Sequence, residues 1–481
     1  MLDYWSKPPG GLFCSAETEA QTDTRTNDTT QDRRPGLCSK VLRSRNRILT
    51  RRETGREPRF LRRQATLATT LLFLLIFSGP PKFRIRAPEA SLRGDMDWVV
   101  VMHILVWGLA GAWVLRQLVE PGRITRLLKR LSLPQKLGLT MTLCLAVSAV
   151  LSKAPAFSLF KIYQMAVTLL FMQLFVDRFG HKNCLRKIFW GTVLLCGAIA
   201  ACSVVAPDMV WIASDFNPNP SRLVGYLIAP TGSVSVFAII LLLTGVRKIW
   251  RAVPLALMSV CLGLLAFSLL RTAYLVMFGF VVLALIKRPD AKALKQFAYA
   301  SGALALGLYA YELLPKLSNY RQPEDVANLG DRIGLWSYLS HITLTQSPWL
   351  GLGYYSASRL YGPLYNTALG NAHSMFLEIL LGGGVVSLAL FMALCIMLSV
   401  QAAYLLFKNR DRFTFAIATL FFASLVFGAM GDEIDSGPVA MCFWYSATVL
   451  PWMCEWPSMR AAAPDEHRRR LLMRAVVADE T

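Results

Sequence analysis

The sequence predicts an all-α integral membrane protein of about 12 transmembrane helices, with a large external loop that carries an amphipathic helix. Two observations predict this fold class. Of the 481 residues, 54% are hydrophobic and only 17% are charged, whereas a soluble domain carries about 25% charged residues. A bilayer crossing takes about 20 apolar residues, so about twelve crossings would use roughly half of this chain. The composition therefore excludes soluble enzymes, disordered proteins and secreted disulfide scaffolds.

Apolar runs along the chain define the candidate spans. The first is short and follows arginines, as the core of a signal peptide does, but its Ser-Gly-Pro-Pro exit is a poor cleavage site and we count it as a weak span. Only Arg271 separates the seventh from the eighth, so these two form either one broken helix or a tight hairpin. The spans are 66–79, 98–115, 137–152, 157–176, 188–206, 224–244, 252–270, 272–286, 297–314, 374–399, 413–430 and 438–454.

The basic residues indicate how the chain is oriented. A net charge of +21 would suggest a nucleic-acid partner in a soluble protein, but here Lys and Arg lie in short runs between the apolar segments. Loops on one side hold 20 of them in 54 positions, and loops on the other side hold 11 in 104 positions. The richer side is cytoplasmic by the positive-inside rule. We therefore expect both termini in the cytoplasm and the loop 315–372 outside.

These assignments divide the chain into five parts. A start at Met96 would remove the N-terminal tail together with the weak first span. The ten cysteines include no Cys-x-x-Cys pair and no zinc-like spacing, and most lie in apolar segments, so we expect buried thiols. The parts are a disordered basic cytoplasmic tail (1–65), nine spans (66–314), the external loop (315–372), three further spans (373–454) and a basic cytoplasmic tail (455–481).

The external loop is too aromatic for a disordered linker. Apolar residues recur in it at helical spacing, with polar residues such as Asp331 and Ser340 between them, which predicts an amphipathic helix on the outer membrane face. A long ordered loop of this kind acts as a lid or a binding element, or simply packs on the bundle without a ligand. The apolar positions are Leu329, Ile333, Trp336, Leu339 and Ile342.

Four ionisable residues stand at the outer ends of spans, where burying a charge is costly. They lie in short motifs. Arg222 begins R-x-x-G, Arg271 lies in S-x-x-R-T-A, and Arg332 lies in D-R-x-x-x-W. The stretch S-P-W-L-G-L-G-Y follows at 347–354, and His373 lies in A-H-S-x-x-L-E-x-L-x-x-G-G at 372–384. The predicted topology places all four residues on the same side of the membrane.

This series of motifs resembles the O-antigen ligase and polymerase superfamily, most densely over 330–390. The resemblance implies a polytopic glycosyltransferase of the bacterial cytoplasmic (inner) membrane, with no cofactor and no nucleic-acid partner. Its donor would be a polyprenyl-diphosphate-linked glycan and its acceptor a sugar or lipid-linked sugar. The chain departs from the family at His373-Ser374, where His-Asn is usual, and at Ala229-Pro230-Thr231.

The chemistry of such a transfer assigns a role to each residue. Positive charge is needed where the diphosphate leaves, and the planar guanidinium fork suits phosphate oxygens, so we assign Arg222, Arg271 and Arg332 to the diphosphate. A neutral imidazole can take the acceptor's proton near pH 7, which makes His373 the expected base. Alternatives stay open: topology or snorkelling for Arg222 and Arg271, an ion pair with Asp331 for Arg332, and an ordinary interfacial role for His373.

Two further residues are expected to support the site. Trp336 would lie beside the substrate, and Glu378, one turn into its span, would brace His373 or a polar neighbour. His341 is the other histidine of the external loop and the next candidate base. The acids of the loop 431–436 could be taken as a metal site, but three acids in an outer loop also follow from topology. We therefore expect a metal-independent enzyme.

Other functions fit the sequence less well. A transporter or flippase for lipid-linked glycans also has about twelve spans, but it would show internal repeats and charges at the membrane midplane. An intramembrane protease would need a Gly-x-Ser-x-Gly elbow or paired aspartates. The sequence does not separate a ligase from a polymerase, because these differ in the acceptor.

Overall fold

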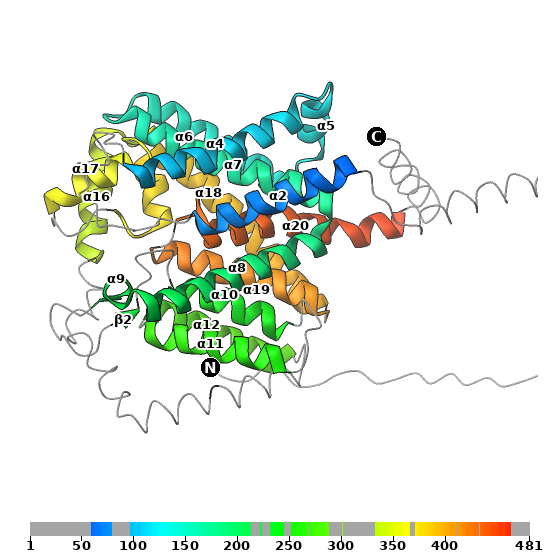
Figure 1. Cartoon of the computed structure of the whole chain (residues 1–481). Coiled ribbons are helices and arrows are strands. Elements are labelled where there is room, and N and C mark those ends of the chain that lie inside the picture. The colour runs from blue at the N-terminus through cyan, green and yellow to red at the C-terminus, as the bar shows by residue number, and fades with distance from the viewer. Residues whose placement is uncertain are drawn as a thin grey trace, which may run out of the picture. The chain divides into compact units, whose positions relative to one another are not determined.

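The computed structural model is a bundle of helices. It describes residues 59–78, 97–212, 222–223, 231–244, 252–268, 270–287, 301, 332–365, 371–409, 411–431 and 433–462. The helices, drawn in Figure 1, are α2 (Arg59–Phe77), α4 (Trp98–Leu118), α5 (Arg123–Arg130), α6 (Leu133–Val150), α7 (Pro155–Phe179), α8 (His181–Val205), α9 (Pro207–Val210), α10 (Thr231–Leu243), α11 (Ala252–Ser268), α12 (Arg271–Lys287), α16 (Arg332–Gln346), α17 (Ser356–Tyr365), α18 (Met375–Lys408), α19 (Arg412–Ala429) and α20 (Gly437–Ala462). Two short strands, β1 (Trp211–Ile212) and β2 (Arg222–Leu223), pair antiparallel.

Six of the described helices are long and apolar enough to cross a membrane, namely α4, α6, α7, α8, α18 and α19. Shorter apolar helical segments lie within α2, α10 and α11. These are the helices of an integral membrane protein, as the composition predicts, although the expected count of about 12 spans is not confirmed. A helix occupies each expected segment except 297–314, which lies outside the described residues apart from Ser301.

The ends of the helices follow from local sequence. Ser132 and Gln135 form a capping box at the start of α6, and Asp411 accepts hydrogen bonds from the first amides of α19. Helices extend into both regions that the sequence analysis assigned to tails: α2 begins at Arg59, and α20 continues to Ala462. The remainder of the two expected tails, 1–58 and 463–481, lies outside the described residues.

The core lies where α6, α7, α18, α19 and α20 pack on one another. The close approach of α6 and α20 depends on a small residue. A Cβ added at Gly138 of α6 would lie 2.9 Å from the ring of the buried Trp444 in α20. The cysteines of the described residues are free thiols. The sequence analysis expected buried thiols, but Cys144, Cys202 and Cys454 are only half-buried. They lie on helix faces that neighbouring helices cover only in part.

The helix α18 is broken at Gly383 and Gly384, and a loop of the chain fills the break. The amide of Leu352 donates to the carbonyl of Leu381 (2.6 Å), and the amide of Val385 donates to the carbonyl of Pro348 (2.8 Å). Gly384 has φ +65°, and a Cβ there would lie 2.4 Å from the Trp349 carbonyl. The glycines of the motifs at 347–354 and 372–384 thus let the backbones of the loop and of α18 come into contact. The loop forms hydrogen bonds with backbone groups that the break in α18 leaves exposed.

The external loop contains the expected helix, but its buried face differs from the prediction. In α16 the buried residues are Leu335, Leu339 and Thr343, whereas Ile333 is 52% exposed. The reason is that α16 packs on α17 and α18 (Figure 1). The side chains that face these two helices, such as Leu335 and Leu339, are therefore buried. Leu329 lies outside the described residues.

Candidate functional site

His373 has a backbone conformation that L-residues rarely adopt. Its φ is +50°, in the left-handed region, and it lies two residues before the start of α18. Its amide donates to Oδ1 of Asn371 (3.2 Å). Such a conformation costs free energy and persists only where the surroundings fix it. The neighbouring residues therefore have to hold His373 in place.

Ala372, directly before His373, is held on both sides of its backbone. Nε1 of Trp336 donates to the Ala372 carbonyl (2.8 Å), and the Ala372 amide donates to Oε1 of Glu378 (2.9 Å). The other carboxylate oxygen of Glu378, which is buried, accepts from Oγ of Ser358 (3.0 Å). Trp336 and Glu378, both expected at the site, thus join α16, α17 and α18 around the residue that precedes His373.

Arg332 and His373 both approach the turn that follows α19. Nη1 of Arg332 donates to the carbonyl of Met430 (2.7 Å), the residue that ends α19, where a cation is favoured by the helix dipole. A Cβ built on the next residue, Gly431, would lie 3.8 Å from Nδ1 of His373 and 3.9 Å from Nη1 of Arg332. The structure therefore brings these two predicted site residues together. Asp331, the alternative partner of Arg332, lies outside the described residues.

The strand that contains Arg222 packs on α11, and Arg271 follows the end of that helix. The backbone of Arg222 pairs with Ile212 in the neighbouring strand. The ring of Trp211 packs on Phe267 in the last turn of α11 (centroids 5.4 Å apart), and Arg271 begins the next helix, α12, with an exposed side chain. The side chain of Arg222 lies outside what the structure describes.

The two arginine-containing regions lie at the same end of the bundle. A Cβ at Gly232, at the start of α10, would lie 2.9 Å from Leu270, the residue before Arg271. Further along α10, Phe237 packs on Phe427 in the last turn of α19 (5.6 Å). The described contacts do not join Arg222 or Arg271 directly to His373 or Arg332.

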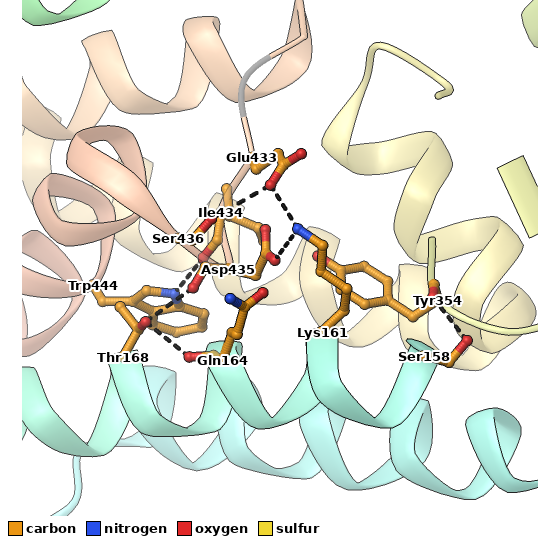
Figure 2. Close-up of polar contacts among 10 residues, drawn as sticks. All are labelled: Ser158, Lys161, Gln164, Thr168, Tyr354, Glu433, Ile434, Asp435, Ser436 and Trp444. Atoms are coloured by element: carbon orange, nitrogen blue, oxygen red, sulfur yellow. Dashed lines mark hydrogen bonds and ion pairs between the residues drawn. The ribbon is translucent and has the colours of Figure 1, made fainter. Parts of the chain in front are cut away.

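A buried ion cluster, which the sequence analysis missed, lies next to this turn. Figure 2 shows Lys161 rising from α7 to the loop after α19, with Nζ 2.8 Å from Oε2 of Glu433 and 2.9 Å from Oδ2 of Asp435. Nζ also lies 4.7 Å from the ring centroid of Tyr355, at cation–π distance. A lysine inside the apolar run 157–176, with acids in a short outer loop, was the signal that could have indicated the pair.

Further hydrogen bonds hold the backbone of the loop 433–436 (Figure 2). Oγ1 of Thr168 donates to the Asp435 carbonyl (3.0 Å), and Nε1 of Trp444 donates to the Ile434 carbonyl (2.9 Å). With its amide nitrogen facing Asp435, Gln164 donates to Oδ2 (3.2 Å). Asp435 is fully buried, and burial raises the pKa of its carboxyl above the usual value.

The acids of this loop are occupied by the lysine. The ammonium group lies where a cation would bind to Glu433 and Asp435. Within the part of the chain that the structure describes, no cluster of three His, Cys, Asp or Glu residues is suited to a metal ion. Asp432 lies outside that part.

Comparison with known proteins finds a family match for one part of the chain. Residues 230–392 match the family model of the O-antigen ligases. This match confirms the resemblance that the motifs indicate to the O-antigen ligase and polymerase superfamily. It contains Arg271, Arg332, Trp336, His373 and Glu378, while Arg222 lies just before it.

Among curated proteins, none matches the chain. The family is glycosyltransferase-like and acts on lipid-linked glycans. Together, the O-antigen ligase match and the apolar helices indicate a bacterial inner-membrane protein that serves polysaccharide or lipopolysaccharide synthesis.

Proposed function

We propose that the protein transfers a glycan from a polyprenyl diphosphate carrier to an acceptor sugar at the outer face of the cytoplasmic membrane. The observation that carries this proposal is the approach of Arg332 and His373 to the same residue, Gly431. A cation and an imidazole, the two groups that the proposed reaction needs, lie near this turn, and both Arg332 and His373 belong to the matched residues 230–392.

The proposed reaction is a single displacement. The acceptor hydroxyl oxygen forms a bond to the anomeric carbon of the donor sugar while the bond to the diphosphate oxygen breaks, with inversion at that carbon. The hydroxyl proton goes to His373, and the leaving polyprenyl diphosphate keeps the electron pair of the broken bond. Guanidinium groups stabilise the charge that develops there, so the diphosphate leaves without a strong general acid.

In this proposal the arginines divide into two groups. Arg222 and Arg271, at the end of α11, bind the diphosphate on the side of α10 and α12. Arg332, at the start of α16, approaches it from the side of His373. Trp336 and Glu378 fix the backbone of Ala372 and thereby the position of the base. No metal ion takes part.

The function is tested with purified protein in liposomes that contain a polyprenyl-diphosphate-linked glycan. One set of liposomes also contains a lipid-linked sugar acceptor, and another contains the donor alone. Transfer to the separate acceptor is the expected result for a ligase, and lengthening of the donor's own glycan is the expected result for a polymerase. Movement of the donor across the bilayer with no new glycosidic bond would contradict the proposal and indicate a flippase.

A further inference from the structure

The Lys161 cluster contains more charge than one ion pair needs. Two carboxylates share one ammonium group, and the side chains of Lys161, Glu433 and Asp435 are 12%, 11% and 0% exposed. Removing three charged groups from water is costly, and a buried ion pair often stabilises a fold no better than apolar side chains of similar size. A gain in folding stability is therefore a weak explanation for the cluster. Its position next to the Met430–Gly431 turn suggests a role at the proposed site instead.

Lys161 contacts two segments, and each of them leads to His373. On one side it binds Glu433 and Asp435, which follow the Met430–Gly431 turn after one residue. That turn lies next to Arg332 and His373. On the other side its ammonium lies over the ring of Tyr355.

The second segment leads from Tyr355 to the base. Tyr355 has φ +58° and directly precedes α17, in which Ser358 donates to Glu378. Glu378 in turn accepts the hydrogen bond from the amide of Ala372, next to His373. One turn before Lys161 on α7, Oγ of Ser158 donates to the carbonyl of Tyr354 (2.9 Å), which fixes this segment to the same helix (Figure 2).

We propose that Lys161, together with Glu433 and Asp435, is a positioning residue that sets the Met430–Gly431 turn, and hence Arg332, relative to His373. This inference rests on the proposed transfer function, because it assigns Lys161 a role in that reaction. Lys161 itself touches neither substrate. It acts through the turn, so its loss slows transfer more than it weakens binding of the donor, which Arg222 and Arg271 still hold.

The test uses the full-length protein and four variants. Lys161→Met removes the cation, Lys161→Arg keeps it, and Lys161→Met/Glu433→Gln/Asp435→Asn removes all three charges together. Lys153→Met is the matched control, because Lys153 also lies over a tyrosine ring, that of Tyr361 (5.3 Å), but is exposed and outside the cluster. The triple variant is expected to fold even if Lys161→Met does not, since no buried charge is left without a partner.

Two readouts separate the inference from the proposed function. Amide hydrogen exchange of residues 428–436, followed by mass spectrometry, needs no substrate. We expect faster exchange in Lys161→Met and in the triple variant, and unchanged exchange in Lys161→Arg and Lys153→Met. Faster exchange in the variants with no glycan transfer by the wild type would support the anchored turn and contradict the proposed function alone.

Kinetics provide the second readout. We expect kcat to fall by about ten- to a hundredfold in Lys161→Met and in the triple variant, with a smaller change in the donor KM and recovery in Lys161→Arg. In a double-mutant cycle with Arg332→Ala, the two losses should combine to less than their product. Wild-type exchange and kcat in the triple variant, or equal losses in Lys153→Met, would overturn the inference.

Discussion

His373 combines a reactive side chain with a strained backbone, and the two features have separate causes. The left-handed φ is maintained by hydrogen bonds on Ala372, whereas the imidazole lies beside Gly431 and Arg332. A residue that is fixed in this way loses little entropy when it takes part in a reaction, which favours an accurately placed base. The same fixation means that a change of side chain at this position leaves the backbone clamps intact.

The base assignment predicts a clear separation of binding from chemistry. His373→Ala should leave the affinity for the lipid-linked donor nearly unchanged while transfer falls by about two to four orders of magnitude, because only proton removal is lost. Donor binding and transfer rates are measured on the same preparation. His341→Ala, an exposed position on α16, is the control and should keep the wild-type rate. A His373→Ala protein that binds donor and transfers normally would exclude His373 as the base.

The diphosphate assignment predicts the opposite pattern. Arg222→Ala or Arg271→Ala removes a charge-assisted contact worth about 1.5–3 kcal/mol, so donor affinity should fall by about ten- to a hundredfold. Lysine at either position should restore affinity only in part, because it lacks the planar fork. Titration with the donor in detergent measures the effect. Full recovery with lysine would show that only charge, not bidentate geometry, is needed.

No metal ion is expected to be needed, because the arginines supply the positive charge and Lys161 lies between Glu433 and Asp435. Transfer in the presence of EDTA should therefore equal transfer without it. If chelation abolished the activity and magnesium or manganese restored it, the acids of the loop 431–436 would have to be reconsidered as ligands.

At the scale of the helix, the break in α18 is the feature that most depends on residue type. Gly384 needs both its left-handed φ and the absence of a Cβ, because the Trp349 carbonyl lies against it. The site depends on this contact, because the loop that enters the break continues through Tyr354 and Tyr355 to α17. In α17, Ser358 donates a hydrogen bond to Glu378 of α18.

Gly384→Ala should therefore separate the loop from α18. The strained backbone alone costs about 1–3 kcal/mol, and the steric overlap adds to it, so the thermal midpoint in detergent should fall and transfer should be lost. Gly279→Ala is the matched control, because Gly279 lies inside α12 with no atom within 4 Å of an added Cβ. That substitution should leave the midpoint equal or slightly higher. Equal midpoints for the two variants would contradict the interlocked structure.

The helices could be predicted from the sequence because their signal, a run of apolar residues, is local and depends only on neighbouring residues. The caps at Ser132 and Asp411 became apparent in the structure. Contacts between distant segments could not be predicted. The contact of Lys161 with Glu433 joins residues 272 positions apart, and no periodicity encodes it. The break at Gly384 was not predicted for the same reason, because a glycine in an apolar run does not indicate which distant backbone will approach it.

At the scale of the whole molecule, the charge asymmetry of the loops predicts that α16 faces the outside. Ser337→Cys, at an exposed position of α16, should react with a membrane-impermeant maleimide on intact cells. Asn183→Cys, exposed at the start of α8, should react only after permeabilisation. Labelling is measured against a background in which the native cysteines are replaced. The reverse pattern would overturn the orientation and, with it, the outer location of the proposed site.

The break in α18 also divides the helix by length. The part after it, Val385–Lys408, has about 24 residues and is about 36 Å long, which exceeds the roughly 30 Å hydrocarbon thickness of a bilayer. This part can therefore cross the membrane unaided. The short part before it, Met375–Gly382, is not needed for the crossing. Its residues therefore need not all be apolar, and it can contain the buried carboxylate of Glu378. Substitutions in the short part should affect catalysis without affecting insertion into the membrane.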